Sequence, residues 1–228
     1  MRKSPEARRA EIVSAAATIA LTEGLEIITM RRVADELAVR PGLISHYFPV
    51  AEDLVAEAFG VAATAELDDL IPADRTKEDA LADLARFFLR TTGERYDGMS
   101  RLWLNARHLS RYRDTLRDRV GHQEGRWRDR LTHLIRDGVE AGVFRTEDPL
   151  LASIQILVVL DGLGAHANTE RGNRPPAVTG MAVATAEREL DVPRGTLAEL
   201  MAAPHIADRS GTREPSGTRE PSGTPEPE

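Results

Sequence analysis

Three neighbouring side chains, Ser45, His46 and Tyr47, place hydrogen-bond donors and acceptors next to one another in the short segment PGLISHYF. A helix of this length is slim enough to enter the ~12 Å major groove of DNA, where base edges and phosphates offer matching partners. These residue types therefore predict recognition by hydrogen bonding rather than a chemical reaction.

Catalytic patterns are missing from the sequence. The chain has no cysteine, which excludes disulfides, thiolate metal sites and cysteine nucleophiles. None of the six histidines stands in a metal-ligand spacing, and there is no Gly-x-Ser-x-Gly elbow, P-loop or dinucleotide-binding glycine pattern. We expect no catalytic residue, no metal and no cofactor. A small helical enzyme that uses His108 with an acidic partner is the alternative that the residues leave open.

The elements that must position Ser45, His46 and Tyr47 are predicted to be three short helices of an all-α fold, since the hydrophobic periodicity is helical and strand signals are missing. Cap and stop residues bound these helices: Ser4-Pro5, Gly24, Thr29, Pro41 and Pro49. Six apolar residues should form the joint core of the second and third helices: Val33, Ala34, Leu37, Val39, Ile44 and Phe48. The alternative is a structural cluster with an accidental polar face.

The charge is distributed unevenly along the chain. The net charge is −7, but residues 1–50 hold seven Lys/Arg and six Asp/Glu, so this part carries about +1 and the other residues about −8. A mildly basic N-terminal unit on an acidic body fits a small DNA-reading domain.

The pattern of the predicted helix-turn-helix resembles the TetR family of bacterial regulators. The matching positions are Thr29, Val33-Ala34, Ala38-Val39-Arg40, Gly42, Ile44 and Tyr47-Phe48. The segment GLISHYF looks closest to the BetI-like subgroup, and the likeness continues more loosely to about residue 190. The resemblance implies an all-helical homodimer that binds a pseudopalindromic operator and leaves it when a small molecule enters the C-terminal domain. We expect it to act as a repressor, and an activator of the same fold is the alternative.

Two positions depart from the family pattern. Arg40 replaces a Ser or Thr that usually caps the recognition helix, and Ala51 replaces a Lys that usually contacts a phosphate. Arg40 cannot cap the helix, but its guanidinium can reach a phosphate. The loss at Ala51 should lower the salt dependence of binding by roughly one unit of slope.

The resemblance assigns DNA contacts residue by residue. We expect base-edge contacts from Leu43, Ser45 and His46. The remaining contacts, to phosphates or along the helix start, are expected from Thr29, Arg40, Pro41, Gly42 and Tyr47. Arg31 and Arg32 are as compatible with a solvated face as with a phosphate contact.

The sequence pattern predicts two of the middle helices at 98–119 and 121–141. The middle helices carry aromatic and polar residues that could line an effector cavity, as the family implies: Phe88, Trp103, Asn105, His108, Tyr112, Trp127 and His166. Asn105, His108 and Tyr112 can share one helix face. The alternative is that the aromatics are plain core and His108 is a satisfied histidine. The aromatics are few and scattered in the sequence, which argues against a cage for a quaternary ammonium such as choline.

A helix near residues 149–167 is apolar all round and is expected to bury two sides, one of them against a second copy of the chain together with the helix near 177–191. Six residues make the predicted dimer seam: Ile154, Leu157, Val158, Asp161, Gly162 and Ala165. The alternative is that this helix faces only the core of its own chain.

The chain is predicted to divide into a helix-turn-helix domain, 1–50, a ligand-binding and dimerisation domain, 51–206, reached through a connecting helix at 50–71, and a disordered repeat tail, 207–228. The longest apolar run, Leu150–Leu163, contains Gln155 and Asp161. It is expected to be too short for a bilayer and to form a buried helix. With no signal-peptide pattern at the start, we expect a cytoplasmic protein with no membrane partner.

Overall fold

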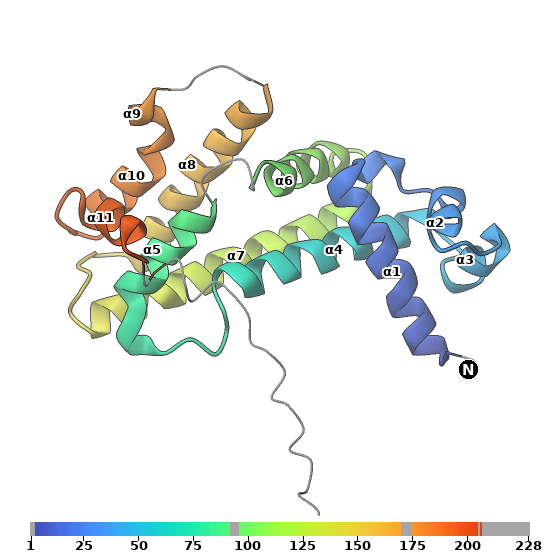
Figure 1. Cartoon of the computed structure of the whole chain (residues 1–228), viewed down its shortest axis with the longest axis horizontal. Coiled ribbons are helices and arrows are strands. Elements are labelled where there is room, and N and C mark those ends of the chain that lie inside the picture. Colours follow the sequence, from blue (N-terminus) through green and yellow to red (C-terminus); the bar gives the residue numbers. More distant parts are fainter. Residues whose placement is uncertain (1–2, 92–95, 170–174, 205, 207–228) are drawn as a thin grey trace, which may run out of the picture.

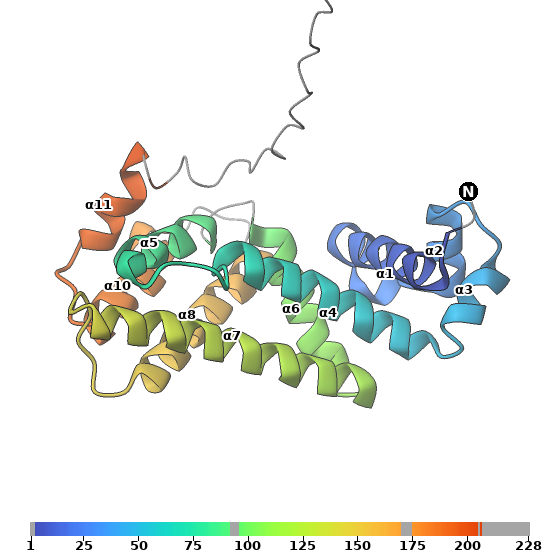
Figure 2. The same cartoon turned by 90° about the horizontal axis from the view of Figure 1, so that it is seen from below.

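The computed structural model describes residues 3–91, 96–169, 175–204 and 206, and the predicted repeat tail lies outside these ranges. Every regular element within them is helical, which confirms the predicted fold class. Two long helices, α4 (Ala51–Leu70) and α7 (Asp114–Glu140), run side by side in the same direction (Figures 1 and 2). Helices α1 to α3 lie at one end of this pair, and α5 and α8 to α11 lie at the other.

The first helix, α1 (Pro5–Thr22), begins and ends where the sequence indicates. The Ser4 hydroxyl accepts a hydrogen bond from the Ala7 N–H at 3.2 Å, and Gly24, with φ +121°, turns the chain into the short helix η1 (Leu25–Ile27). The apolar face of α1 packs on α4, and both faces are rich in alanine. These small side chains let the two helices pack closely, so the N-terminal helices sit firmly on the connecting helix.

Helices α2 (Met30–Glu36) and α3 (Pro41–Tyr47) form the helix-turn-helix. The Thr29 hydroxyl caps α2 by accepting the Arg32 N–H at 3.0 Å, whereas Arg40 provides no side-chain cap to α3. The predicted joint core forms: four of its residues are buried and two are half-buried, respectively Val33, Ala34, Ile44 and Phe48, and Leu37 and Val39. The turn between the helices passes through Ala38 in the left-handed region, at φ +52°.

One helix boundary in the middle of the chain was predicted wrongly. The sequence pattern suggested helices at 98–119 and 121–141, but α6 is Asp97–Ser110 and α7 continues through Gly121. The chain breaks at 111–113, where the Arg117 side chain donates to the carbonyl oxygens of Ser110 and Arg111 at 3.1 and 3.3 Å. A side chain from the next helix satisfies the end of α6, so no glycine or proline is needed there.

The remaining helices complete the body of the protein. The segment η2 (Lys77–Asp79) leads into α5 (Ala80–Thr91). Gly142, at φ +74°, ends α7, and the Asp148 carboxylate caps α8 (Pro149–Thr169) by accepting two backbone N–H groups. The predicted helix at 177–191 is divided at Gly180 into α9 (Pro176–Thr179) and α10 (Met181–Glu189), and α11 (Thr196–Ala202) follows.

Helix α8 differs from the expectation of a fully buried helix. It has 21 residues and is long and apolar enough to cross a membrane by length and composition, so the prediction that it is too short was wrong. Only 17% of its most apolar window is buried within the described chain. The face carrying Leu151, Ile154 and Val158 is exposed, while Ala152, Ser153 and Ile156 pack inward. Apolar side chains left exposed in a row on one helix indicate a face against which another surface can pack.

Candidate functional site

The outer face of α3 carries four side chains that are exposed or half-buried in the described structure. Ser45 and His46 are exposed and Leu43 and Tyr47 are half-buried. The Ser45 hydroxyl makes one long bond to the Pro41 carbonyl at 3.3 Å, and the His46 and Tyr47 rings meet edge to face at 5.3 Å. The predicted base-contacting residues therefore lie together on one accessible face, held from behind by buried Ile44 and Phe48.

The arginines near α3 separate into paired and unpaired groups. Arg32 makes ion pairs with Glu23 and with Glu36, the latter at 2.8 Å, and the pKa of its guanidinium is raised mainly by the hydrogen bond to Glu23. Arg31 and Arg40 are exposed, and no ion pair or hydrogen bond joins either side chain to another described residue. Arg31 and Arg40 can therefore reach a phosphate without breaking an internal contact, whereas Arg32 cannot.

Gly42 stands in the first turn of α3 with no neighbour that requires it. A Cβ added at this position would meet nothing within 4 Å, and the backbone is helical. Glycine destabilises a helix by roughly 0.5–1 kcal/mol relative to alanine. The folded chain alone gives no reason for this cost, which fits close approach by an external molecule.

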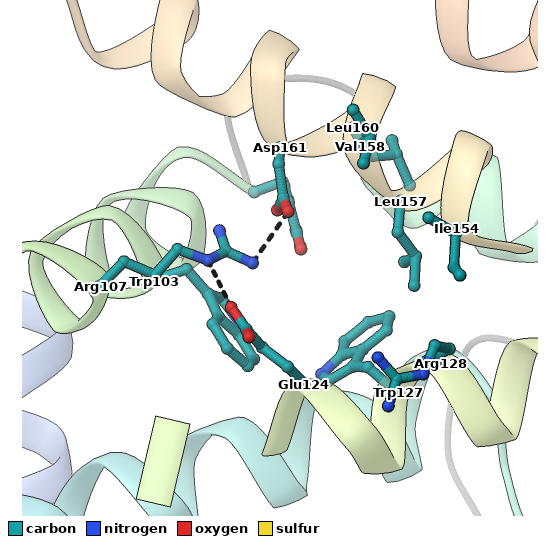
Figure 3. Close-up of a pocket in the computed structure, with 11 residues that line it drawn as sticks. Trp103, Arg107, Glu124, Trp127, Arg128, Ile154, Leu157, Val158, Leu160 and Asp161 are labelled. Carbon is teal, nitrogen blue, oxygen red and sulfur yellow. Dashed lines mark hydrogen bonds and ion pairs between the residues drawn. The ribbon is translucent and has the colours of Figure 1, made fainter. Parts of the chain in front are cut away.

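A cavity lies between α6, α7 and α8 in the body of the protein (Figure 3). Its volume is about 230 Å³. Three aromatic side chains contribute to its wall, and charged and apolar side chains of all three helices complete it: Tyr96, Trp103, Arg107, Glu124, Trp127, Arg128, Ile154, Leu157, Val158, Leu160 and Asp161. The structure thus brings together aromatic residues that are far apart in the sequence. Their spacing in the sequence is therefore no argument against an aromatic cage for a quaternary ammonium.

Arg107 is the centre of the polar end of this cavity. Its Nε donates to Glu124 and its Nη2 donates to Asp161, both at 2.8 Å, and its guanidinium lies 5.1 Å from the centroid of the Trp103 ring (Figure 3). Burial raises the pKa of Asp161, although Arg107 opposes this shift. One cation therefore links three helices and holds two carboxylates beside an aromatic face.

Trp103 connects this cavity to the helix that carries the helix-turn-helix. Its indole N–H donates to the Glu66 carboxylate of α4 at 2.7 Å, and its ring meets Phe59 of α4 edge to face at 5.0 Å. Glu66 is 7% exposed, and burial raises its pKa to about 7, against the smaller opposing effect of the hydrogen bond from Trp103. A change in the position of Trp103 would therefore alter its contacts with Phe59 and Glu66 on α4.

The second tryptophan has an unused donor. The Nε1 atom of Trp127 is buried and has no hydrogen-bond partner among the described residues. An indole N–H that is buried without a partner costs free energy.

Only two of the predicted effector-binding residues, Trp103 and Trp127, lie in the wall of this cavity. Phe88 is fully buried beside Phe87. Asn105 donates to Glu26 at 3.4 Å, and Tyr112 is 74% exposed beyond the end of α6, with its ring 5.9 Å from that of His108. His108 and His166 are exposed on α6 and α8. The helical spacing of Asn105, His108 and Tyr112 therefore does not bring them to the cavity.

The predicted dimer seam and the cavity share residues. Four of the six seam residues line the cavity: Ile154, Leu157, Val158 and Asp161. Ile154 is 37% and Val158 63% exposed, so the cavity wall continues onto the exposed face of α8. Gly162 is exposed, Ala165 is half-buried, and neither lines the cavity.

Sequence reasoning did not select Tyr96, Glu66 or Glu124 for this site. Glu66 could have been found, because it follows Phe59, Ala62 and Ala63 along the apolar stripe of α4 and is the only charged residue there between Phe59 and Leu70 on that face. The others belong to ordinary amphipathic helices, and only tertiary packing places them together.

A helix-turn-helix joined by one long helix to an all-helical body is the architecture of a transcriptional regulator. Residues 77–192 match the family model described as the C-terminal domain of BetI-type transcriptional repressors. The chain belongs to this BetI-type branch of the TetR family, whose members are transcriptional regulators and not enzymes. This confirms the resemblance drawn from the helix-turn-helix. No curated protein sequence matches the chain.

Several solved structures share the fold. A TetR-family regulator from Rhodococcus sp. is 19% identical with a TM-score of 0.66, and covers 80% of this chain and 98% of its own. A transcriptional regulator from Saccharomonospora viridis in complex with choline is 22% identical with a TM-score of 0.64, and covers 80% and 97%. A regulator from Pseudomonas aeruginosa is 22% identical with a TM-score of 0.64, and covers 86% and 95%.

Proposed function

We propose that this protein is a homodimeric repressor that binds a pseudopalindromic operator and is released by a small molecule. The observation that carries the DNA-binding role is the outer face of α3, where accessible polar side chains stand on a short helix braced by Ile44 and Phe48. Leu43, Ser45 and His46 contact base edges. Thr29, Arg40, Tyr47 and the backbone N–H of Gly42 contact the phosphates, with Pro41 at the start of the helix beside them. Arg31, which has no ion-pair or hydrogen-bond partner among the described residues, adds to these contacts.

The dimer forms through the exposed face of α8. Helix-turn-helix proteins read two half-sites about one helical turn apart, ~34 Å, and need two recognition helices at a defined separation. The row Leu151, Ile154 and Val158 continues to Gly162 and Ala165 at the spacing of a helix-packing seam, and no Lys or Arg interrupts it. Met181 on the neighbouring α10 is also exposed and extends this apolar surface.

The effector binds in the cavity between α6, α7 and α8. The volume of about 230 Å³ lies below the roughly 300–1,000 Å³ of drug-sized sites and suits a small molecule. Aromatic faces of Trp103 and Trp127 with the carboxylates of Glu124 and Asp161 favour an organic cation. A related regulator of the same fold was solved with choline, which supports this ligand class. Binding shifts Trp103 and, through Phe59 and Glu66, tilts α4 and the recognition helix.

The test is operator binding by the purified protein. Fluorescence anisotropy with the DNA upstream of its own gene, against a scrambled duplex of equal length, should show sequence-dependent binding whose affinity falls with salt. Choline should then weaken binding to the specific duplex. Equal affinity for both duplexes at every salt concentration would refute the regulator role, and specific binding that no organic cation alters would refute only the effector class.

A further inference from the structure

The cation site of the cavity is already occupied by the protein itself. The Arg107 guanidinium lies over the Trp103 ring and donates to Glu124 and Asp161, which is the combination of aromatic face and carboxylates that binds an organic cation. We propose that Arg107 is a resident cation, which the positive group of the effector must replace in order to bind. This proposal rests on the proposed function, in which the cavity is the effector site. Arg107 then sets the effector concentration that is needed for a response.

The contacts of Arg107 allow it to leave. The exposed fractions of the Arg107, Glu124 and Asp161 side chains are 36%, 42% and 48%. Ion pairs with this exposure are screened by water and contribute little net stability. The arginine arm is long and flexible, and its aliphatic part can remain against the protein while the guanidinium turns into solvent. An incoming cation therefore replaces an exchangeable contact rather than a locked one.

An anion does not fit this position. Two of the five guanidinium N–H donors already hold carboxylates, so an anionic ligand at Arg107 would lie beside two negative groups. The carboxylates of Glu124 and Asp161 share this single guanidinium. A ligand that brings positive charge relieves this arrangement.

The two tryptophans make the test direct, because the chain has no others and both line the cavity. Choline is titrated into the wild type, Arg107→Met and Arg128→Met while tryptophan emission is followed. Arg128→Met is the matched control, because Arg128 lies in the same wall without holding Glu124 or Asp161. Arg107→Met should bind choline about 5-fold tighter or more, a change worth about 1 kcal/mol, and Arg128→Met should stay within about 2-fold. The neutral isostere 3,3-dimethylbutan-1-ol should bind to Arg107→Met no more tightly than to the wild type.

The outcomes separate the two levels of the argument. Equal or weaker choline binding by a folded Arg107→Met protein overturns the resident-cation role, while release of the operator by choline in the wild type would still uphold the proposed function. A gain in Arg128→Met as large as in Arg107→Met also overturns it, because long-range charge would then explain both. If Arg107→Met does not fold, Arg107→Ala with methylguanidinium replaces it: saturable recovery of stability and tryptophan emission supports the proposal, and no recovery contradicts it.

Discussion

The recognition face of α3 and the cavity of the body differ in whether their polar side chains have partners within the protein. On α3, Ser45, His46 and the nearby Arg40 point into solvent, where water satisfies them until a larger partner arrives. In the cavity, Arg107, Glu124 and Asp161 bind one another. The difference follows from the neighbouring residues, because Arg107 has carboxylates of α7 and α8 within hydrogen-bond distance, whereas Arg40 has no such partner among the described residues. The donors on α3 stay free for an external partner, whereas those of Arg107 are held by the protein's own side chains.

The largest effect is expected from a substitution on α8, because this helix contributes to both the cavity and the proposed dimer interface. Val158→Glu places a charge in the apolar face and should convert the dimer to a monomer with operator affinity reduced about 100-fold or more, because the two half-sites no longer bind together. Analytical ultracentrifugation and anisotropy measure both effects. Val61→Glu, at an exposed valine of α4, is the control and should change neither. If Val158→Glu remains a dimer with full operator affinity, the dimer interface does not lie on this face of α8.

The buried side of the comparison is tested by pH. The pKa of Glu66 is raised to about 7, so the folded chain binds more protons at this carboxyl than the unfolded chain between about pH 4.5 and 7. Stability from this group is present at low pH and is lost as pH rises through about 7, by about 2–3 kcal/mol between pH 5 and 8. Glu66→Gln keeps an acceptor for Trp103 and should remove this loss. Urea unfolding at several pH values measures it, and parallel curves for both proteins would contradict the assignment.

The exposed side is tested by separating base contacts from phosphate contacts. Ser45→Ala and His46→Ala should change which base pairs are preferred, by about 1–3 kcal/mol at the affected position. Tyr47→Ala should weaken binding to all sequences alike. Binding to a set of single-base operator variants distinguishes these results. A uniform loss in all three proteins would show that the division of roles is wrong.

Arg31 and Arg32 allow a sharper version of the same test, because they are neighbours on α2 and differ in their contacts. Arg31→Ala and Arg40→Ala should each lower the slope of log affinity against log salt by about 1. Arg32→Ala should leave the slope nearly unchanged, since Glu23 and Glu36 already hold its guanidinium. An Arg32 effect equal to that of Arg31 would mean that the ion pair opens on DNA.

The smallest expected effects concern two positions in the helix-turn-helix backbone. Ala38→Gly relieves the left-handed conformation at φ +52° and should stabilise the protein by about 1 kcal/mol without changing DNA affinity. Gly42→Ala should also stabilise it, by up to about 1 kcal/mol, but should weaken DNA binding, because a methyl group then occupies the approach path. Thermal unfolding and anisotropy together measure both. Unchanged operator affinity in Gly42→Ala would show that DNA does not approach the backbone closely at Gly42.

Much of the N-terminal part could be predicted from the sequence because its signals are local. Ser4, Thr29 and Pro41 each begin a helix through contacts within a few residues, and the core of α2 and α3 follows from apolar spacing. The assignment to the TetR family rests on the same short segment and is confirmed by a match to the other part of the chain. The break at 111–113 escaped prediction because Arg117 caps α6 from the following helix.

The sequence by itself determined that the chain is all-helical, that it carries a helix-turn-helix and that α3 presents Ser45, His46 and Tyr47 outward. Only the tertiary structure decided where a small molecule can bind. Trp103, Glu124 and Asp161 come from three helices far apart in the sequence, and periodicity reveals that a helix has a buried face without revealing what it faces. Asn105 and His108 have suitable chemistry and spacing, but the packing of α6 turns them away from the cavity and leaves that place to Arg107.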